Sequence, residues 1–149
     1  MKIKKDTWVF VADGSKALIL ENQGTPMTPN LRVVRSAKLI TPPTRELGRD
    51  RPGRMPDASS PHRSGMEAPD LHEREEERFL SEQIDGLLAD RANQKFKSLV
   101  VVAPPIALGR IRKAMDEPLK SSVVATFDKG IAHRPIEEIC SAVAEYPNP

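Results

Sequence analysis

The sequence predicts a single α/β domain built on one mixed five-stranded sheet with helices packed on it. Two patterns lead to this prediction. The first third of the chain holds three strand-like segments in succession, and the last part alternates short apolar strands with amphipathic helices. A chain of 149 residues also has the length of one domain. The predicted order is β-β-β-α-β-α-β-α, and the domain covers residues 1–149.

The first two strands are predicted to form a hairpin. Residues 7–14 are rich in β-branched and aromatic side chains and end at Asp13-Gly14, a strong signal for a two-residue turn in which both positions need positive φ. Residues 15–22 should then return antiparallel to the first strand. A third strand is expected over residues 31–40, and Pro42 and Pro43 end it because proline cannot donate to a sheet.

Residues 41–69 are predicted to be a long, flexible basic loop between the third strand and the first helix. Prolines are scattered through this segment and large apolar side chains are almost absent, so it cannot pack a core of its own. The candidate nucleic-acid-binding residues lie here: Arg45, Arg49, Arg51, Arg54, His62 and Arg63.

The first helix is expected to begin at Asp70. Asp70 and Glu73 have the spacing of a capping box, and an acidic first turn suits the positive end of the helix dipole. Apolar side chains then recur at steps of three and four residues up to Phe96, which predicts a long amphipathic helix.

The rest of the chain predicts two crossover units. Residues 97–105 have the continuous apolar run of a strand buried on both faces, and a helix with proline near its first position follows over residues 106–117. A fifth strand is expected over residues 121–130. The last helix, over residues 134–146, should turn Ile136, Ile139, Cys140 and Val143 inward. Because such crossovers return right-handed to a parallel strand, all five strands join one sheet.

Composition excludes several classes of protein. The lone Cys140 rules out a disulfide framework, and the three histidines lack metal-ligand spacing, so we predict neither a metal nor a cofactor. The apolar run near the amino terminus, residues 8–12, is too short for a signal peptide or a membrane span, and we expect a cytoplasmic protein without membrane insertion. The sequence leaves the oligomeric state open.

The loop arginines suggest a function. Guanidinium groups make bidentate contacts with phosphates and stack on bases, so the loop is a candidate contact for the RNA backbone. Acidic side chains follow it closely, above all in residues 73–77. The alternative is therefore a solvated loop whose arginines pair with those acids or with nothing.

An enzymatic alternative comes from the element order, which is also that of the ribonuclease H-like fold. Enzymes of that fold gather carboxylates around two metal ions. Here the middle of the first strand is apolar, Asp13 lies in a turn, and Asp128 ends its strand. We therefore predict a non-catalytic protein and keep metal-dependent hydrolysis of RNA as the less favoured alternative.

Four segments in order resemble the bacterial host attachment protein family, described as required for attachment to host cells: residues 8–20, WVFVADGSKALIL; residues 48–54, GRDRPGR; residues 72–79, HEREEERF; and residues 99–115, LVVVAPPIALGRIRKAM. That family in turn is similar to the middle domain of archaeal and eukaryotic class-1 translation release factors. The resemblance implies a ribonuclease H-like fold with its functional loop between the third strand and a long helix.

In those release factors the loop carries Gly-Gly-Gln, which promotes hydrolysis of peptidyl-tRNA. Here Gly48, Gly53 and Gly65 are isolated, and no glutamine lies between residues 45 and 65. What the resemblance implies for this chain is a basic loop that contacts the ribosome or another structured RNA. The family's name implies a different partner, a protein or glycan on a host surface.

Overall fold

The computed structural model describes residues 1–40 and 61–148, with the side chains of residues 61–70 left out of the description. Its body is a five-stranded sheet with the strand order β3-β2-β1-β4-β5. The first three strands, β1 (Thr7–Ala12), β2 (Lys16–Asn22) and β3 (Leu31–Lys38), form an antiparallel meander. The other two, β4 (Ser98–Ala103) and β5 (Val123–Asp128), run parallel to β1. The predicted α/β domain with a mixed sheet is confirmed.

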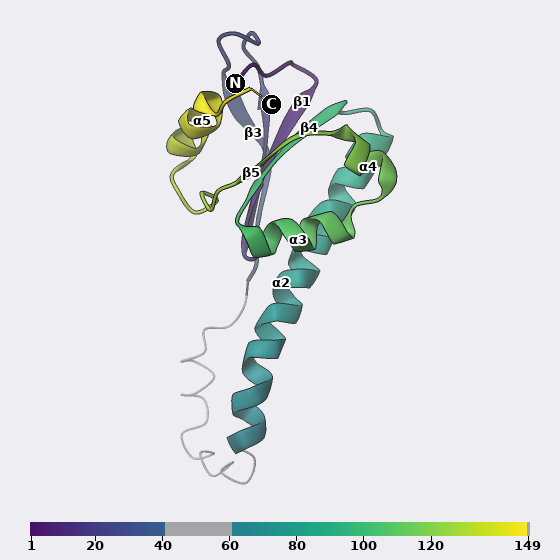
Figure 1. Cartoon of the computed structure of the whole chain (residues 1–149), viewed down its shortest axis with the longest axis vertical. Coiled ribbons are helices and arrows are strands. Elements are labelled where there is room, and N and C mark those ends of the chain that lie inside the picture. Colours follow the sequence, from purple (N-terminus) through teal and green to yellow (C-terminus); the bar gives the residue numbers. More distant parts are fainter. Residues whose placement is uncertain (41–60, 149) are drawn as a thin grey trace.

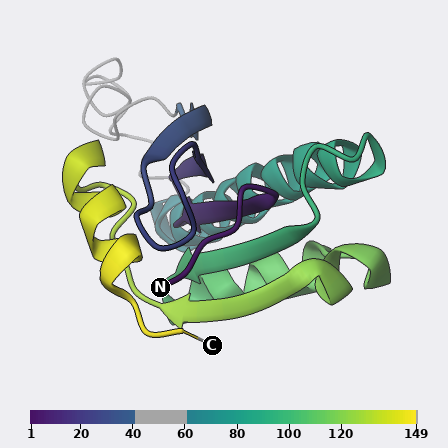
Figure 2. The ribbon, with the colours of Figure 1, turned by 90° about the horizontal axis from the view of Figure 1, so that it is seen from above.

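Helices cover both faces of this sheet. α2 (Pro61–Ala92), α3 (Pro105–Ala114) and the short α4 (Glu117–Ser122) lie on one face, and α5 (Ile136–Glu145) lies on the other (Figure 1). The end-on view in Figure 2 shows these layers. Because neighbouring strand residues point to opposite faces, Phe10 of β1 joins the core under α2 and α3, while Val9 and Val11 join the core under α5.

The β1–β2 turn differs from the expected one. The Asp13 amide donates to the Lys16 carbonyl, so Gly14 and Ser15 occupy the centre of the turn. Among the described residues only Gln94 has a positive φ, and the prediction of positive φ in this turn was wrong. The turn is held instead by the Asp13 carboxylate, which accepts from the Ser15 and Lys16 amides at 2.8 Å each. This is the side-chain-to-backbone pattern that favours aspartate in turns.

The long helix begins earlier than expected. α2 starts at Pro61, so Asp70 lies inside the helix and does not cap it. Proline is well suited to the first position of a helix, but Gly65 and Pro69 further on are among the least favourable residues for a helix interior. The predicted loop therefore overlaps α2 over residues 61–69. Its remainder, residues 41–60, lies outside the described residues.

Two smaller differences lie near the carboxyl end. The sequence analysis missed α4, although Asp116 caps it by accepting from the Leu119 amide at 2.9 Å and Pro118 lies in its first turn. The expectation that Ile136 points inward was wrong, because 48% of its surface is exposed, whereas Ile139 and Val143 are buried as expected. Ile136 is the first residue of α5 and lies outside the apolar cluster that Ile139 and Val143 join.

The amino-terminal part of α2 projects beyond the sheet as a stalk, here defined as the residues of α2 before Phe79 (Figure 1). The rest of the helix is fastened to the body by Phe79, Leu80, Ile84 and Leu87, each of which is at least 96% buried. A buried carboxylate on Asp90 also binds the Arg35 guanidinium of β3. No helix within the described residues is long and apolar enough to cross a membrane.

Candidate functional site

Four of the predicted RNA-contacting residues belong to the segment that joins the body to the stalk, and the other two belong to the stalk itself. Arg45, Arg49, Arg51 and Arg54 lie outside the described residues. His62 and Arg63 lie in the first turn of α2, at the free end of the stalk, and only their backbone is described. At its other end the stalk meets the body, and the described residues there form the base of the stalk (Figure 1).

The base of the stalk packs on the β1–β2 turn. A Cβ atom at Gly14 would overlap Glu76 Oε2, and the absence of a side chain at this position lets the α2 carboxylate lie against the turn. Arg110 of α3 reaches the same place, with its guanidinium 3.5 Å from Glu76 Oε1 and 3.8 Å from Glu77 Oε1. The Arg110 side chain is only 19% exposed and joins α3 to the stalk.

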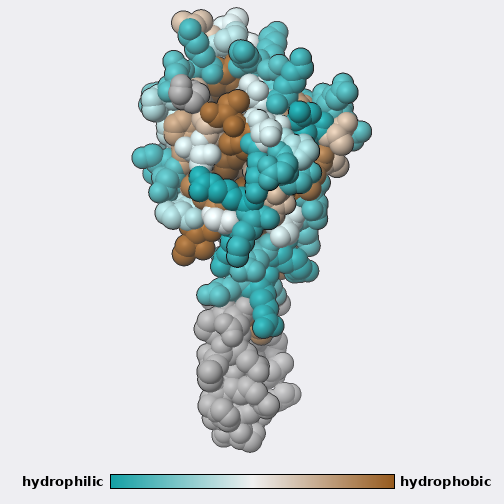
Figure 3. Space-filling model, turned by 45° about the vertical axis from the view of Figure 1, so that its right-hand side comes forward, coloured by the Kyte–Doolittle hydropathy of each residue, from teal (hydrophilic) through white to brown (hydrophobic). Residues whose placement is uncertain are grey.

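The alternative in which the loop arginines pair with the acidic run is weakened at Glu76 and Glu77, because Arg110 already neutralises part of their charge. Glu73, by contrast, is exposed on the stalk. In Figure 3 the described part of the stalk is covered mainly by hydrophilic side chains. An acidic surface repels phosphates, so the base of the stalk, which carries Glu75, Glu76 and Glu77, is a poor RNA contact by itself.

A polar cluster of three side chains joins the β1–β2 turn to the segment between β5 and α5. His133, from the segment between β5 and α5, places Nε2 2.8 Å from Asp13 Oδ2 and 3.1 Å from Ser15 Oγ. In a Ser-His-Asp triad the carboxylate and the serine contact different ring nitrogens. Here both contact the same nitrogen, so the cluster joins two segments of the fold and does not activate Ser15 as a nucleophile.

The metal-dependent alternative finds little support in this geometry. Asp13 uses one carboxylate oxygen for the turn amides and the other for His133. Within the described part of the chain, no three side chains of His, Cys, Asp or Glu lie close enough together to hold a metal ion.

A shallow hollow of about 490 Å3 lies beside the stalk base, between the β1–β2 turn and the start of α3. It is lined by Gly14, Glu76, Pro104, Pro105, Ile106, Ala107 and Arg110. Ile106 projects beside it with 73% of its surface exposed. Sequence reasoning missed this grouping because its members come from three distant parts of the chain. The signal that was available is Pro104-Pro105, which places the start of α3 at the carboxyl end of β4.

The comparisons with known proteins agree with this architecture. A family model described as bacterial archaeo-eukaryotic release factor family 12 matches residues 6–143. Among solved structures, the chain is similar to the crystal structure of an archaeal translation termination factor, aRF1, with a TM-score of 0.52 and 12% sequence identity. The match covers 97% of this chain and 36% of that one, and at this identity it shows a shared fold. No curated protein matches the sequence.

Proposed function

The chain belongs to bacterial archaeo-eukaryotic release factor family 12, and on this premise we propose that it is a ribosome-associated, non-catalytic factor of translation. Its arginine-rich segment contacts ribosomal RNA, and the stalk of α2 carries one end of that segment away from the body. The protein acts in the cytoplasm, where ribosomes are. The observation that carries the proposal is the family match over most of the chain.

The placement of charge supports this proposal. The described stalk is acidic at its base, while five arginines lie between residues 45 and 63, close in sequence to its free end. RNA affinity should therefore come from the arginine-rich segment and depend strongly on salt, because each phosphate contact releases counterions. The acids near the body would keep the backbone of the RNA away from the sheet.

The chemistry of the segment supports a non-catalytic role. It contains no glutamine and no pair of adjacent glycines. The Ser15, His133 and Asp13 cluster lacks the arrangement of a nucleophilic triad. We therefore propose that the factor occupies a site on the ribosome without hydrolysing a peptidyl-tRNA ester.

The proposal is tested by sedimenting the protein with purified ribosomes at a series of salt concentrations. The variant carries Arg49→Ala, Arg51→Ala and Arg54→Ala. If these arginines each contact one phosphate, the variant should bind more weakly, and its slope of log affinity against log salt should fall by about two to three.

The matched control carries Lys2→Ala, Arg32→Ala and Lys97→Ala, which remove the same charge from exposed positions at the end of the sheet opposite the stalk. The control should bind with the salt slope of the unchanged protein. Equal losses of ribosome affinity in both triple variants would show that binding depends on net charge and not on the arginine-rich segment. Absence of the unchanged protein from every ribosomal fraction would remove the proposal and leave attachment to a host protein or glycan as the alternative.

A further inference from the structure

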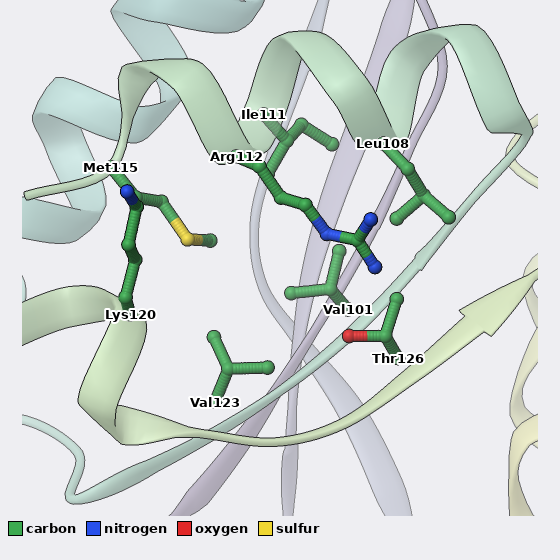
Figure 4. A pocket seen from close by; sticks show the side chains of 8 residues that line it. All are labelled: Val101, Leu108, Ile111, Arg112, Met115, Lys120, Val123 and Thr126. Carbon is green, nitrogen blue, oxygen red and sulfur yellow. The ribbon is translucent and has the colours of Figure 1, made fainter.

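A second pocket lies away from the stalk base, between α3, α4 and β5, with a volume of about 400 Å3. Figure 4 shows its lining: Val101, Leu108, Ile111, Arg112, Met115, Lys120, Val123 and Thr126. The space-filling view in Figure 3 shows apolar side chains gathered in a hollow of the body and surrounded by hydrophilic ones. Pockets of this volume are of the size that holds a small organic molecule.

The walls of this pocket are aliphatic. Val101, Leu108, Ile111 and Met115 belong to the buried core between the sheet and its helices, and Val123 packs against it. None of the lining residues is aromatic, so the pocket offers no ring on which a base or another flat ligand could stack. Flexible aliphatic chains, by contrast, gain from contact with branched side chains and with methionine.

Two cations complete the pocket. The Arg112 guanidinium extends over the cavity between Leu108 and Thr126, and Lys120 stands at the other end beside Met115 (Figure 4). Among the described residues no carboxylate forms an ion pair with Arg112. Within the described part of the chain, Lys120 forms an ion pair with Glu117 alone, at 3.9 Å, and this largely exposed pair is weak. The pocket therefore combines an apolar interior with an unbalanced positive rim.

We propose that this pocket binds a small aliphatic carboxylate. The forked guanidinium of Arg112 matches the two oxygens of a carboxylate, and the Thr126 hydroxyl beside it can donate a further hydrogen bond. Lys120 adds a second positive charge, and the aliphatic tail lies along Leu108, Ile111 and Met115. The proposal does not depend on the ribosome, because the pocket shares no lining residue with the stalk base.

The first test compares two ligands of equal chain length and opposite charge, decanoate and decyltrimethylammonium, below the concentrations at which they form micelles. Amide signals of the unchanged protein are followed by two-dimensional NMR during each titration. The signal changes caused by decanoate should reach saturation, and the amides of α3, α4 and β5 should shift at the lowest decanoate concentrations. The cationic ligand should bind at least about tenfold more weakly. Equal binding of both ligands, or shifts spread evenly over the protein, would overturn the proposal.

Variants test the same pocket from the protein side. Arg112→Ala should weaken decanoate binding by roughly tenfold, the loss of one charge-assisted contact. Lys113→Ala is the matched control, because Lys113 is an exposed cation on the same helix that does not line this pocket. Thr126→Trp should fill the cavity and abolish binding, and its melting curve shows whether the fold is kept. Unchanged decanoate affinity in Arg112→Ala would exclude the proposed carboxylate contact.

Discussion

Gly14 is the residue at which the stalk meets the body, because the Glu76 carboxylate of α2 lies where a Cβ atom of residue 14 would be. Its backbone does not need glycine, since its φ is not positive. What occupies the space beside Gly14 is the end of the Glu76 side chain, which comes from a helix far away in the sequence. Asp13 next to it has a local role, because its carboxylate accepts hydrogen bonds from two amides of its own turn.

At this scale we predict different effects of two Gly→Ala substitutions. Gly14→Ala should change the free energy of unfolding by less than about 0.5 kcal/mol, because the added methyl group meets only the end of the flexible Glu76 side chain, and the weakened contact with Arg110 is offset by the lower conformational entropy of the unfolded chain. Gly109→Ala, on exposed α3 with no atom within 4 Å of the new Cβ, should raise it by about 0.5–1 kcal/mol. Urea denaturation measures both. A loss of more than about 1 kcal/mol in Gly14→Ala would show instead that the Glu76 side chain is fixed against the turn.

Single residues also show which features could be predicted from the sequence and which could not. The turn at Asp13-Gly14 was predictable because its signal is local, whereas the conformation assigned to it was wrong because the turn is held by a side chain. The contacts of Gly14 with Glu76, and of Asp13 with His133, join residues far apart in the chain. Such contacts leave no periodic pattern in a single sequence.

Among the elements, α2 has the largest effect on the shape of the molecule, because its first part projects as the stalk. The apolar side chains of its carboxyl-terminal half are buried on the sheet, and an ion pair joins this half to β3. The Asp90 side chain is only 7% exposed and receives the Arg35 guanidinium, with Lys95 Nζ at 3.7 Å from its other oxygen. Gly86 leaves room for this arginine, because a Cβ atom there would lie 3.3 Å from Arg35 Nη2.

For this anchor we predict that Asp90→Asn lowers the free energy of unfolding by about 2 kcal/mol, since it leaves two cations without their shared, nearly buried carboxylate. Asp85→Asn is the matched control on the exposed side of the same helix and should change stability by less than about 0.5 kcal/mol. Thermal or urea unfolding measures both variants. Equal effects would show that Asp90 does not anchor α2.

The elements themselves were largely predictable. All five strands and the three longer helices follow from runs of apolar residues and their spacing, because burial of those side chains is what forms the elements. The start of α2 was missed because Gly65 and Pro69 oppose helix formation locally. α4 was missed because six residues are too few for a hydrophobic period, although Asp116 and Pro118 mark its beginning.

For the whole molecule, the sheet topology gives two ends with different surroundings. The β1–β2 turn, the start of α3 and the stalk gather at one end, and the segment between β2 and β3 lies at the other (Figure 1). In our proposal the RNA contact lies at the stalk end, because α2 begins close in sequence to the arginine-rich segment. The fold class, an α/β domain with one mixed five-stranded sheet, could be predicted from the sequence, whereas the stalk could not, because its length depends on where α2 begins.

The most direct test of this assignment is photocrosslinking from the two ends of the molecule. The photoreactive amino acid p-benzoylphenylalanine replaces either Leu71, which is 54% exposed on the stalk, or Met27, which is 72% exposed at the opposite end. Each variant is irradiated with purified ribosomes, and crosslinked RNA is identified by sequencing. We predict crosslinks to ribosomal RNA from position 71 and none from position 27. Crosslinks from position 27 alone, or from neither position, would contradict an RNA contact at the stalk end.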